Sequence, residues 1–201
     1  EISCSLVGSE MCIRDSTRGE GAKPISSEKI TETDKHSGGT MQVMYCSSQT
    51  NKKYIRPLII AEDIDISSVN GVNLNLETLI NDPNIGPVIN QLSQLYDIIY
   101  IDNNNGLDDI NHNACLFRDA INKVNQNLFQ VLGTTVADSI YVVGLGMGGL
   151  VARVALNMME TNHEQHRVRK LISINTPYRG LNVPAGLQSF IRHIRTVSYT
   201  H

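Results

Sequence analysis

Residues 139–156, "SIYVVGLGMGGLVARVAL", join a strand-like run to a glycine-rich turn and a helix-like run. The glycines fit two frames that carry different chemistry. Gly144, Gly146 and Gly148 fit G-x-S-x-G, in which a serine at a sharp turn attacks a carbonyl carbon. Gly146 stands at the serine position and has no side chain that can attack. In the second frame, Gly144, Gly146 and Gly149 spell G-x-G-x-x-G, a pattern typical of dinucleotide binding.

The dinucleotide alternative lacks a second requirement. That pattern belongs to the first β-α-β unit of its fold, and a carboxylate at the end of the next strand holds the ribose. Here three strand-like segments come earlier, and the next one ends in Ile174, Asn175 and Thr176. The sequence therefore favours the serine frame and predicts that neither NAD nor FAD binds, while a dinucleotide-binding domain stays open as an alternative.

The elements that must position this turn alternate between strand and helix. Short apolar runs predict strands over residues 41–48, 56–65, 96–102, 139–144 and 169–175. Helical spacing predicts helices within residues 75–95, 113–130 and 148–160. This alternation predicts an α/β fold, with a parallel sheet covered by helices on both faces.

Apolar spacing also predicts which helix faces are buried. Pro83 and Pro87 divide residues 75–95 into two short helices. The second of these is expected to bury Val88, Leu92 and Leu95. The helix over residues 113–130 is expected to bury Phe117, Ile121, Val124 and Leu128 against the sheet.

Several motifs in one order resemble the lipase and esterase type of the α/β-hydrolase superfamily. The turn is similar to the "GHSMGGLVAR" type of nucleophile elbow. Residues 56–65 resemble the strand and loop that supply an oxyanion-hole N–H, and residues 96–125 resemble the strand, loop and helix before the elbow. Residues 171–187 resemble the "TPHxG" segment after it, so the likeness covers residues 41–195.

This resemblance implies an incomplete α/β-hydrolase fold that lacks the C-terminal strands. The activity implied for the parent family is hydrolysis of a small-molecule or lipid ester by a nucleophile, a histidine base, an acid and an oxyanion hole, with no cofactor. The N–H groups of Met147 and Ile64 are then the expected oxyanion donors. Glu62 and Asp65 either orient the oxyanion loop or are ordinary exposed carboxylates.

Three departures from the family pattern bear on activity. Gly146 replaces the serine, and Tyr178 replaces the histidine of "TPHxG". The acid and the histidine of the family follow strands that come after residues 171–175, where this chain stops. Neither His193 nor His201 is expected to act as the base. The chain is therefore expected to be inactive as written, and a natural pseudoenzyme that binds an acyl ligand or a protein partner is an alternative.

No metal site is predicted. Asp102, Asp108 and Asp109 cluster in one loop region without the frame of a calcium loop, so they are expected to be solvated. His163 and His166 lie in a polar turn without a second pair of ligands.

Composition sets further limits. At 201 residues with 41% hydrophobic residues, one globular domain is expected. The net charge is −3 and the basic residues are scattered, which predicts no nucleic-acid partner. The longest weakly polar run, residues 140–152, is too short to span a bilayer.

The two ends of the chain are expected to be foreign to the domain. Residues 1–16 and 196–201 contain "SLVGSEMCIRDS" and "TVSYTH", which resemble translated sequencing adapters. Residues 17–39 are rich in Ser, Thr, Lys, Glu and Gly without an apolar period, which predicts a flexible linker. The hydrolase-like domain is expected to occupy residues 40–195.

Overall fold

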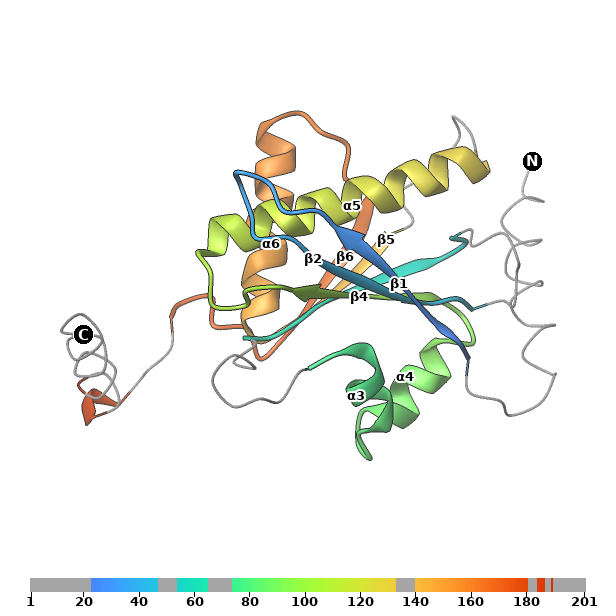
Figure 1. Ribbon diagram of the computed structural model, residues 1–201, viewed down its shortest axis with the longest axis horizontal. Helices are drawn as coiled ribbons and strands as arrows, with labels where there is room; N and C mark the ends of the chain where they lie inside the picture. Colours follow the sequence, from blue (N-terminus) through green and yellow to red (C-terminus); the bar gives the residue numbers. More distant parts are fainter. Residues whose placement is uncertain are drawn as a thin grey trace.

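One six-stranded sheet forms the centre of the molecule (Figure 1). The computed structural model describes residues 23–46, 54–64, 74–132, 140–180, 184–186 and 189. The strands are β1 (Ile25–Ile30), β2 (Gly39–Met44), β3 (Pro57–Ala61), β4 (Asp97–Asn103), β5 (Ile140–Leu145) and β6 (Val168–Ile174). Their order in the sheet is β1-β2-β4-β3-β5-β6. Strands β4, β3, β5 and β6 run parallel, whereas β2 is antiparallel to both β1 and β4.

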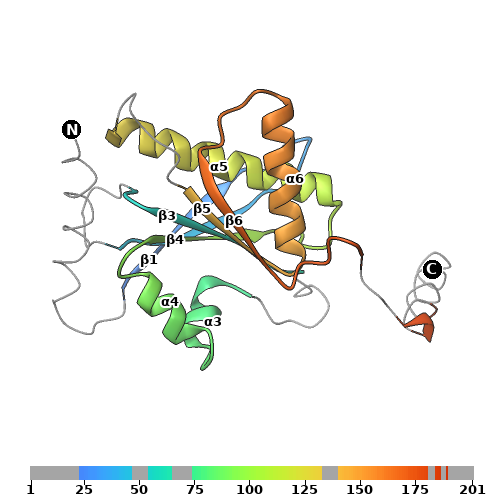
Figure 2. The same cartoon turned by 180° about the vertical axis from the view of Figure 1, so that it is seen from behind.

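Helices cover both faces of the sheet, as Figures 1 and 2 show from opposite sides. Helices α3 (Leu76–Asn81) and α4 (Gly86–Leu92) lie between β3 and β4 in the chain and cover one face. Helices α5 (Ile110–Leu132) and α6 (Met147–Thr161) connect β4 to β5 and β5 to β6 and cover the other face. Parallel neighbours need such crossover helices because a short turn cannot return the chain to the start of the next strand. The predicted parallel sheet with helices on both faces is confirmed.

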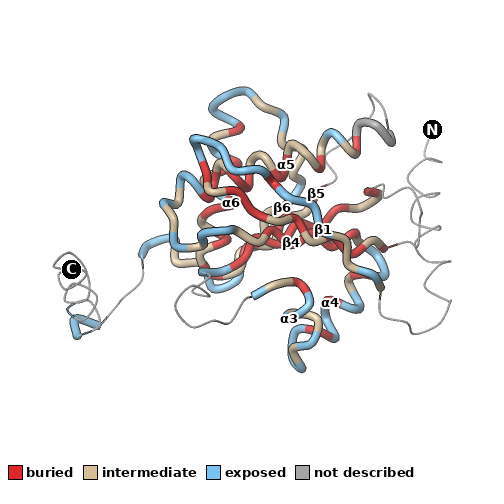
Figure 3. The backbone as a smooth tube through the Cα atoms, viewed as in Figure 1, coloured by how far each residue is buried: buried red, intermediate tan, exposed pale blue. Residues whose placement is uncertain are grey.

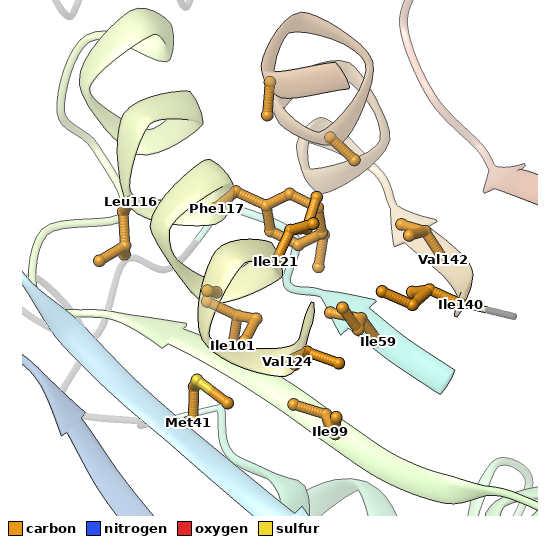
Figure 4. Packing of buried hydrophobic residues seen from close by; sticks show 14 of the residues in the cluster. Met41, Ile59, Ile99, Ile101, Leu116, Phe117, Ile121, Val124, Ile140 and Val142 are labelled. Atoms are coloured by element: carbon orange, nitrogen blue, oxygen red, sulfur yellow. The ribbon is translucent and has the colours of Figure 1, made fainter. Parts of the chain in front are cut away.

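The larger part of the core lies between the sheet and the pair α5 and α6. Figure 4 shows Ile59, Ile99 and Val142 of three neighbouring strands beneath Phe117 and Ile121 of α5. The four α5 residues expected to face the sheet are all buried, which confirms the helical spacing: Phe117, Ile121, Val124 and Leu128. Strand β3 is buried along its whole length and β4 over its first five residues, whereas the outer surfaces of α3 and α4 are exposed (Figure 3).

On the opposite face, the predicted orientation of α4 is wrong in part. Ile89 is 6% exposed and packs on the sheet cluster that contains Leu58 and Ile98, whereas Val88 is 53% exposed. Leu92 is partly buried against that cluster, as expected, but Leu95 is 40% exposed. The prediction assumed a longer helix. Because α4 ends at Leu92, Leu95 lies beyond its end, and Val88 points about 100° away from Ile89.

The prediction of a flexible linker over residues 17–39 is wrong for its described part. Residues 25–30 form β1, which pairs with β2 in register from Ile25 opposite Met44 to Ile30 opposite Gly39. Backbone hydrogen bonds to β2 hold this strand in the sheet, so it needs little apolar patterning. Ile30 is the one buried residue of β1. The Lys123 ammonium group of α5 binds the Glu28 carboxylate at 2.7 Å, which ties β1 to α5. The segments 1–16 and 196–201, and residues 17–22 of the linker, lie outside the described residues.

Adjacent substitutions in α4 test the corrected orientation. Ile89→Ala is expected to lower the free energy of unfolding by about 2–5 kcal/mol, because it leaves a cavity against the sheet. Val88→Ala, one residue earlier, is expected to change it by less than about 0.5 kcal/mol because that side chain is mostly solvated. Urea unfolding followed by circular dichroism measures both. Equal losses for the two variants would contradict the orientation described above.

Candidate active site

The ends of two parallel strands bring the predicted site segments together. Ala61, the last residue of β3, pairs with Gly144 near the end of β5. The loop after β3 and the turn after β5 therefore leave the sheet side by side. The turn also contacts β6, since the Gly146 N–H donates to the Ile174 carbonyl at 2.9 Å.

Gly146 forms a sharp turn between β5 and α6. Its backbone angles are φ +50° and ψ −119°, and it is buried at the N-cap of α6. A positive φ of this size favours glycine because a Cβ atom crowds the backbone there. The chain passes from the last residue of β5 to the first residue of α6 through this single residue.

The neighbouring glycines allow α6 to approach the sheet closely. A Cβ atom on Gly148 would overlap the carbonyl oxygens of Ala61 and Glu62 at the end of β3. A Cβ atom on Gly144 would overlap Gly149, which in turn lies against the Thr176 side chain. The glycines of both sequence frames thus contact other parts of this chain.

The two N–H groups predicted to form an oxyanion hole meet at one atom. The Met147 N–H, from the start of α6, donates to Asp63 Oδ1 at 2.8 Å. The Ile64 N–H, from the loop after β3, donates to the same oxygen at 2.8 Å. A carboxylate at the N-terminus of a helix is also stabilised by the helix dipole. Two separate segments therefore bind one negatively charged oxygen beside Gly146.

Glu62 fixes the loop that carries these groups. Its side chain is 3% exposed, and its Oε1 accepts the Asn103 N–H of β4 at 2.7 Å. The Tyr100 hydroxyl donates to Glu62 Oε2 at 3.4 Å. These bonds agree with the alternative in which Glu62 orients the oxyanion loop, rather than with an ordinary exposed carboxylate. Asp65, the other acid proposed to orient the loop, lies outside the described residues.

Sequence reasoning missed Asp63. Glu62 and Asp65 were weighed as loop acids, but the residue that binds both amides lies between them. The available signal was its position directly before Ile64, because an aspartate side chain readily accepts a nearby backbone N–H.

The acids after β4 hold the start of α5. Asp108 accepts the Asp109 N–H at 2.8 Å and the Ser37 hydroxyl at 2.9 Å, and lies 3.2 Å from His112 Nδ1. The bond from the Asp109 backbone, followed by those from Ser37 and His112, lowers the Asp108 pKa below its ordinary value against the opposing effect of burial. Within the described ranges, no three His, Cys, Asp or Glu side chains are grouped so as to hold a metal ion.

Three of the four described histidines contact acidic side chains away from the turn. His36 is buried, accepts the Gly38 N–H at Nδ1, and contacts Asp119 through Nε2 at 3.1 Å. His112 contacts Asp108, and His166 contacts Glu160 at 3.5 Å. Among the residues that the structure describes, no histidine is hydrogen-bonded to the turn at Gly146. His193 and His201 lie outside those residues.

Tyr178 packs on α6. Its hydroxyl is hydrogen-bonded to the Ser173 hydroxyl, and the Arg153 guanidinium lies 4.9 Å from the ring centroid. Tyr178, at the position of the histidine in the pattern "TPHxG", therefore contacts β6 and α6 while it stays 41% exposed.

A substitution at Gly148 tests the close approach of α6. Gly148→Ala is expected to lower the free energy of unfolding by about 1–3 kcal/mol, because its methyl group overlaps backbone atoms that cannot rotate away. Gly186→Ala is the control, since a Cβ atom there has nothing within 4 Å. Urea unfolding compares the two. An unchanged stability in Gly148→Ala would show that α6 lies farther from β3 than described.

Comparison with known proteins supports an α/β-hydrolase-like fold. Residues 101–197 match the family model of the PGAP1-like alpha/beta domain. A fungal esterase from Rhizomucor miehei aligns with a TM-score of 0.55 at 11% identity, over 92% of this chain and 55% of its own. Carboxyl esterase 2 from Tuber melanosporum aligns with a TM-score of 0.52 at 9% identity, over 86% of this chain and 52% of its own. An esterase from Pseudomonas putida ECU1011 aligns with a TM-score of 0.51 at 13% identity, over 92% of this chain and 53% of its own.

The chain spans about half the length of these three esterases. No curated protein matches its sequence significantly. In the described parts of the chain, no helix is both long and apolar enough to cross a membrane. With its sheet order, its two helix layers and these likenesses, the chain has an α/β-hydrolase-like fold.

Proposed function

We propose that this chain contains the nucleophile turn and the oxyanion hole of an ester-hydrolase domain, with Gly146 at the nucleophile position. The convergence of the Met147 and Ile64 N–H groups on one anionic oxygen, at 2.8 Å each, is the observation that carries the proposal. An oxyanion hole requires donors about 2.7–3.1 Å from the oxygen that becomes negative. Asp63 Oδ1 is in this sense a stand-in for the oxygen of a tetrahedral intermediate.

The chemistry of the parent reaction indicates what is missing. A serine Oγ forms a bond to the ester carbonyl carbon while a base takes its proton, and the alcohol leaves as the acyl-enzyme forms. Water then releases the acid. Gly146 has no Oγ, so we expect no turnover from the chain as written, although the two amide donors for the oxyanion are present.

The substrate class of the parent site would be a carboxylic ester, from a small molecule or a lipid. The three aligned structures are named as esterases, and the proposed chemistry needs no cofactor.

A natural pseudoenzyme is the second candidate. Asp63 favours it, because a Cβ atom at position 146 would overlap its carboxylate. Replacement of a serine at position 146 alone does not account for a matching acid in the neighbouring loop. Such a pseudoenzyme would bind an acyl ligand or a protein partner.

Dinucleotide binding ranks third. Gly144, Gly148 and Gly149 are accounted for by contacts with the chain itself. Strand β6 ends at Ile174 and is followed by Asn175 and Thr176, without the carboxylate that the ribose requires.

Restoring the serine tests whether a general base reaches the turn. In this 201-residue chain, Gly146→Ser is expected to leave p-nitrophenyl acetate hydrolysis at the wild-type background. A general base contributes on the order of a hundred- to ten-thousand-fold, and no described histidine bonds to the turn. The initial rate of p-nitrophenolate release is the measurement. Brisk turnover would indicate that a histidine such as His112 or His193 reaches the turn.

A cysteine tests the nucleophile position without requiring that base. Gly146→Cys is combined with Asp63→Ala, because a Cβ atom at position 146 overlaps the Asp63 carboxylate. The thiolate sulfur bonds to the acetyl carbon of p-nitrophenyl acetate, and p-nitrophenolate leaves with the electron pair. At equal thiolate concentration, acylation is expected to be on the order of a hundred-fold faster than in Gly186→Cys, because two amides stabilise the oxyanion.

The measurement is the burst of p-nitrophenolate release, which is expected to reach one equivalent above the signal of the wild-type chain. The thiolate fraction of each variant is taken from the pH profile of its acylation rate. Subtraction of the wild-type signal removes the contribution of the natural cysteines. Equal rate constants in Gly146→Cys with Asp63→Ala and in Gly186→Cys would refute the proposed nucleophile position.

A further inference from the structure

Asp63 occupies two places that an ester hydrolase keeps for its reaction. Its Oδ1 accepts both the Met147 and the Ile64 N–H, the donors assigned above to the substrate oxyanion. Its Cγ and both carboxylate oxygens also lie where a Cβ atom of residue 146 would be. One side chain therefore fills both the nucleophile position and the oxyanion position.

The surrounding contacts hold Asp63 in this place. The Glu62 carboxylate accepts the N–H of Asn103 at the end of β4, and the Ile64 N–H donates to Asp63 Oδ1. The third contact comes from α6, whose N-terminus favours a negative charge. Among the described residues, Asp63 forms no ion pair, and the residue is exposed, so these backbone donors and the solvent together compensate its charge.

We propose that Asp63 closes the site from within, as an internal carboxylate ligand of the two-amide pocket. A nucleophile restored at position 146 would then lack an oxyanion hole until Asp63 is replaced. The proposal rests on the function proposed above, because it takes Met147 and Ile64 as the oxyanion donors.

Charge explains why an ester does not displace Asp63. The ground-state carbonyl oxygen of an ester is neutral and gains less from the two amides than a carboxylate does, since hydrogen bonds to ionised acceptors are about twice as strong. Asp63 is also covalently attached next to its donors, so its binding costs little association entropy. A free carboxylate, in contrast, matches the charge and shape of Asp63 and is the ligand class expected once that side chain is removed.

The test compares two neutral replacements in the Gly146→Cys chain. Asp63→Ala removes the occupant, whereas Asp63→Asn removes the charge but keeps an oxygen that accepts both amides. The expected result is acylation by p-nitrophenyl acetate on the order of a hundred-fold faster with Asp63→Ala than with Asp63→Asn. Rate constants are again compared at equal thiolate concentration.

Different failures separate the two proposals. If alanine and asparagine give the same fast acylation, Asp63 acts only through its charge and the closure proposal is overturned, while the nucleophile position stands. If both are as slow as Gly186→Cys, the proposed function fails as well. Asp34→Ala, which removes an exposed acid, is the charge-matched control and is expected to leave the rate of Gly146→Cys unchanged.

A second measurement avoids any strain from a side chain at position 146. With Gly146 retained, acetate is titrated into the wild-type chain, Asp63→Ala and Asp63→Asn, and the backbone amide resonances of Ile64 and Met147 are followed by NMR. Saturable shifts of both amides are expected in Asp63→Ala, with at least a ten-fold weaker response in the other two. Equal responses in all three proteins, or none in Asp63→Ala, would overturn the closure.

Discussion

The approach of α6 to the ends of β3 and β5 is the constraint on which the rest of the site depends. Gly148 lies against the carbonyl oxygens of Ala61 and Glu62, and no larger residue fits between them. This contact brings the first N–H of α6 next to the loop that follows β3. If α6 stood farther from the sheet, the Met147 and Ile64 amides would not reach a common oxygen.

Much of the fold follows from local patterns in the sequence. The apolar runs of β3 and β4 identify strands buried on both faces, and the spacing of Phe117, Ile121 and Val124 identifies the inner face of α5. Strand β1 could not be found in this way, because backbone pairing with β2 holds it and its own side chains are mostly polar. Which face of α4 is buried depends on where that helix ends, and the spacing of apolar residues alone does not define that end.

The candidate site was predictable only where position along the chain determines contacts. The glycine frame placed Gly146 at the turn, and chain order suggested Ile64 and Met147 as neighbours of that turn. The carboxylate that joins them was not predictable, because Asp63 Oδ1 meets Met147 through a contact between residues 84 positions apart. A run of loop acids does not reveal which member binds the α6 amide: Glu62 is buried and bonds to β4, whereas the exposed Asp63 bonds to Met147 and Ile64.

The backbone of Gly146 bears on the stability of the turn between β5 and α6. A serine held at a φ near +50° would strain the backbone by on the order of 1–3 kcal/mol, whereas glycine adopts this conformation freely. Many enzymes give up some stability to keep a strained active site. Glycine at position 146 avoids that cost, so the sharp turn between β5 and α6 forms here without backbone strain.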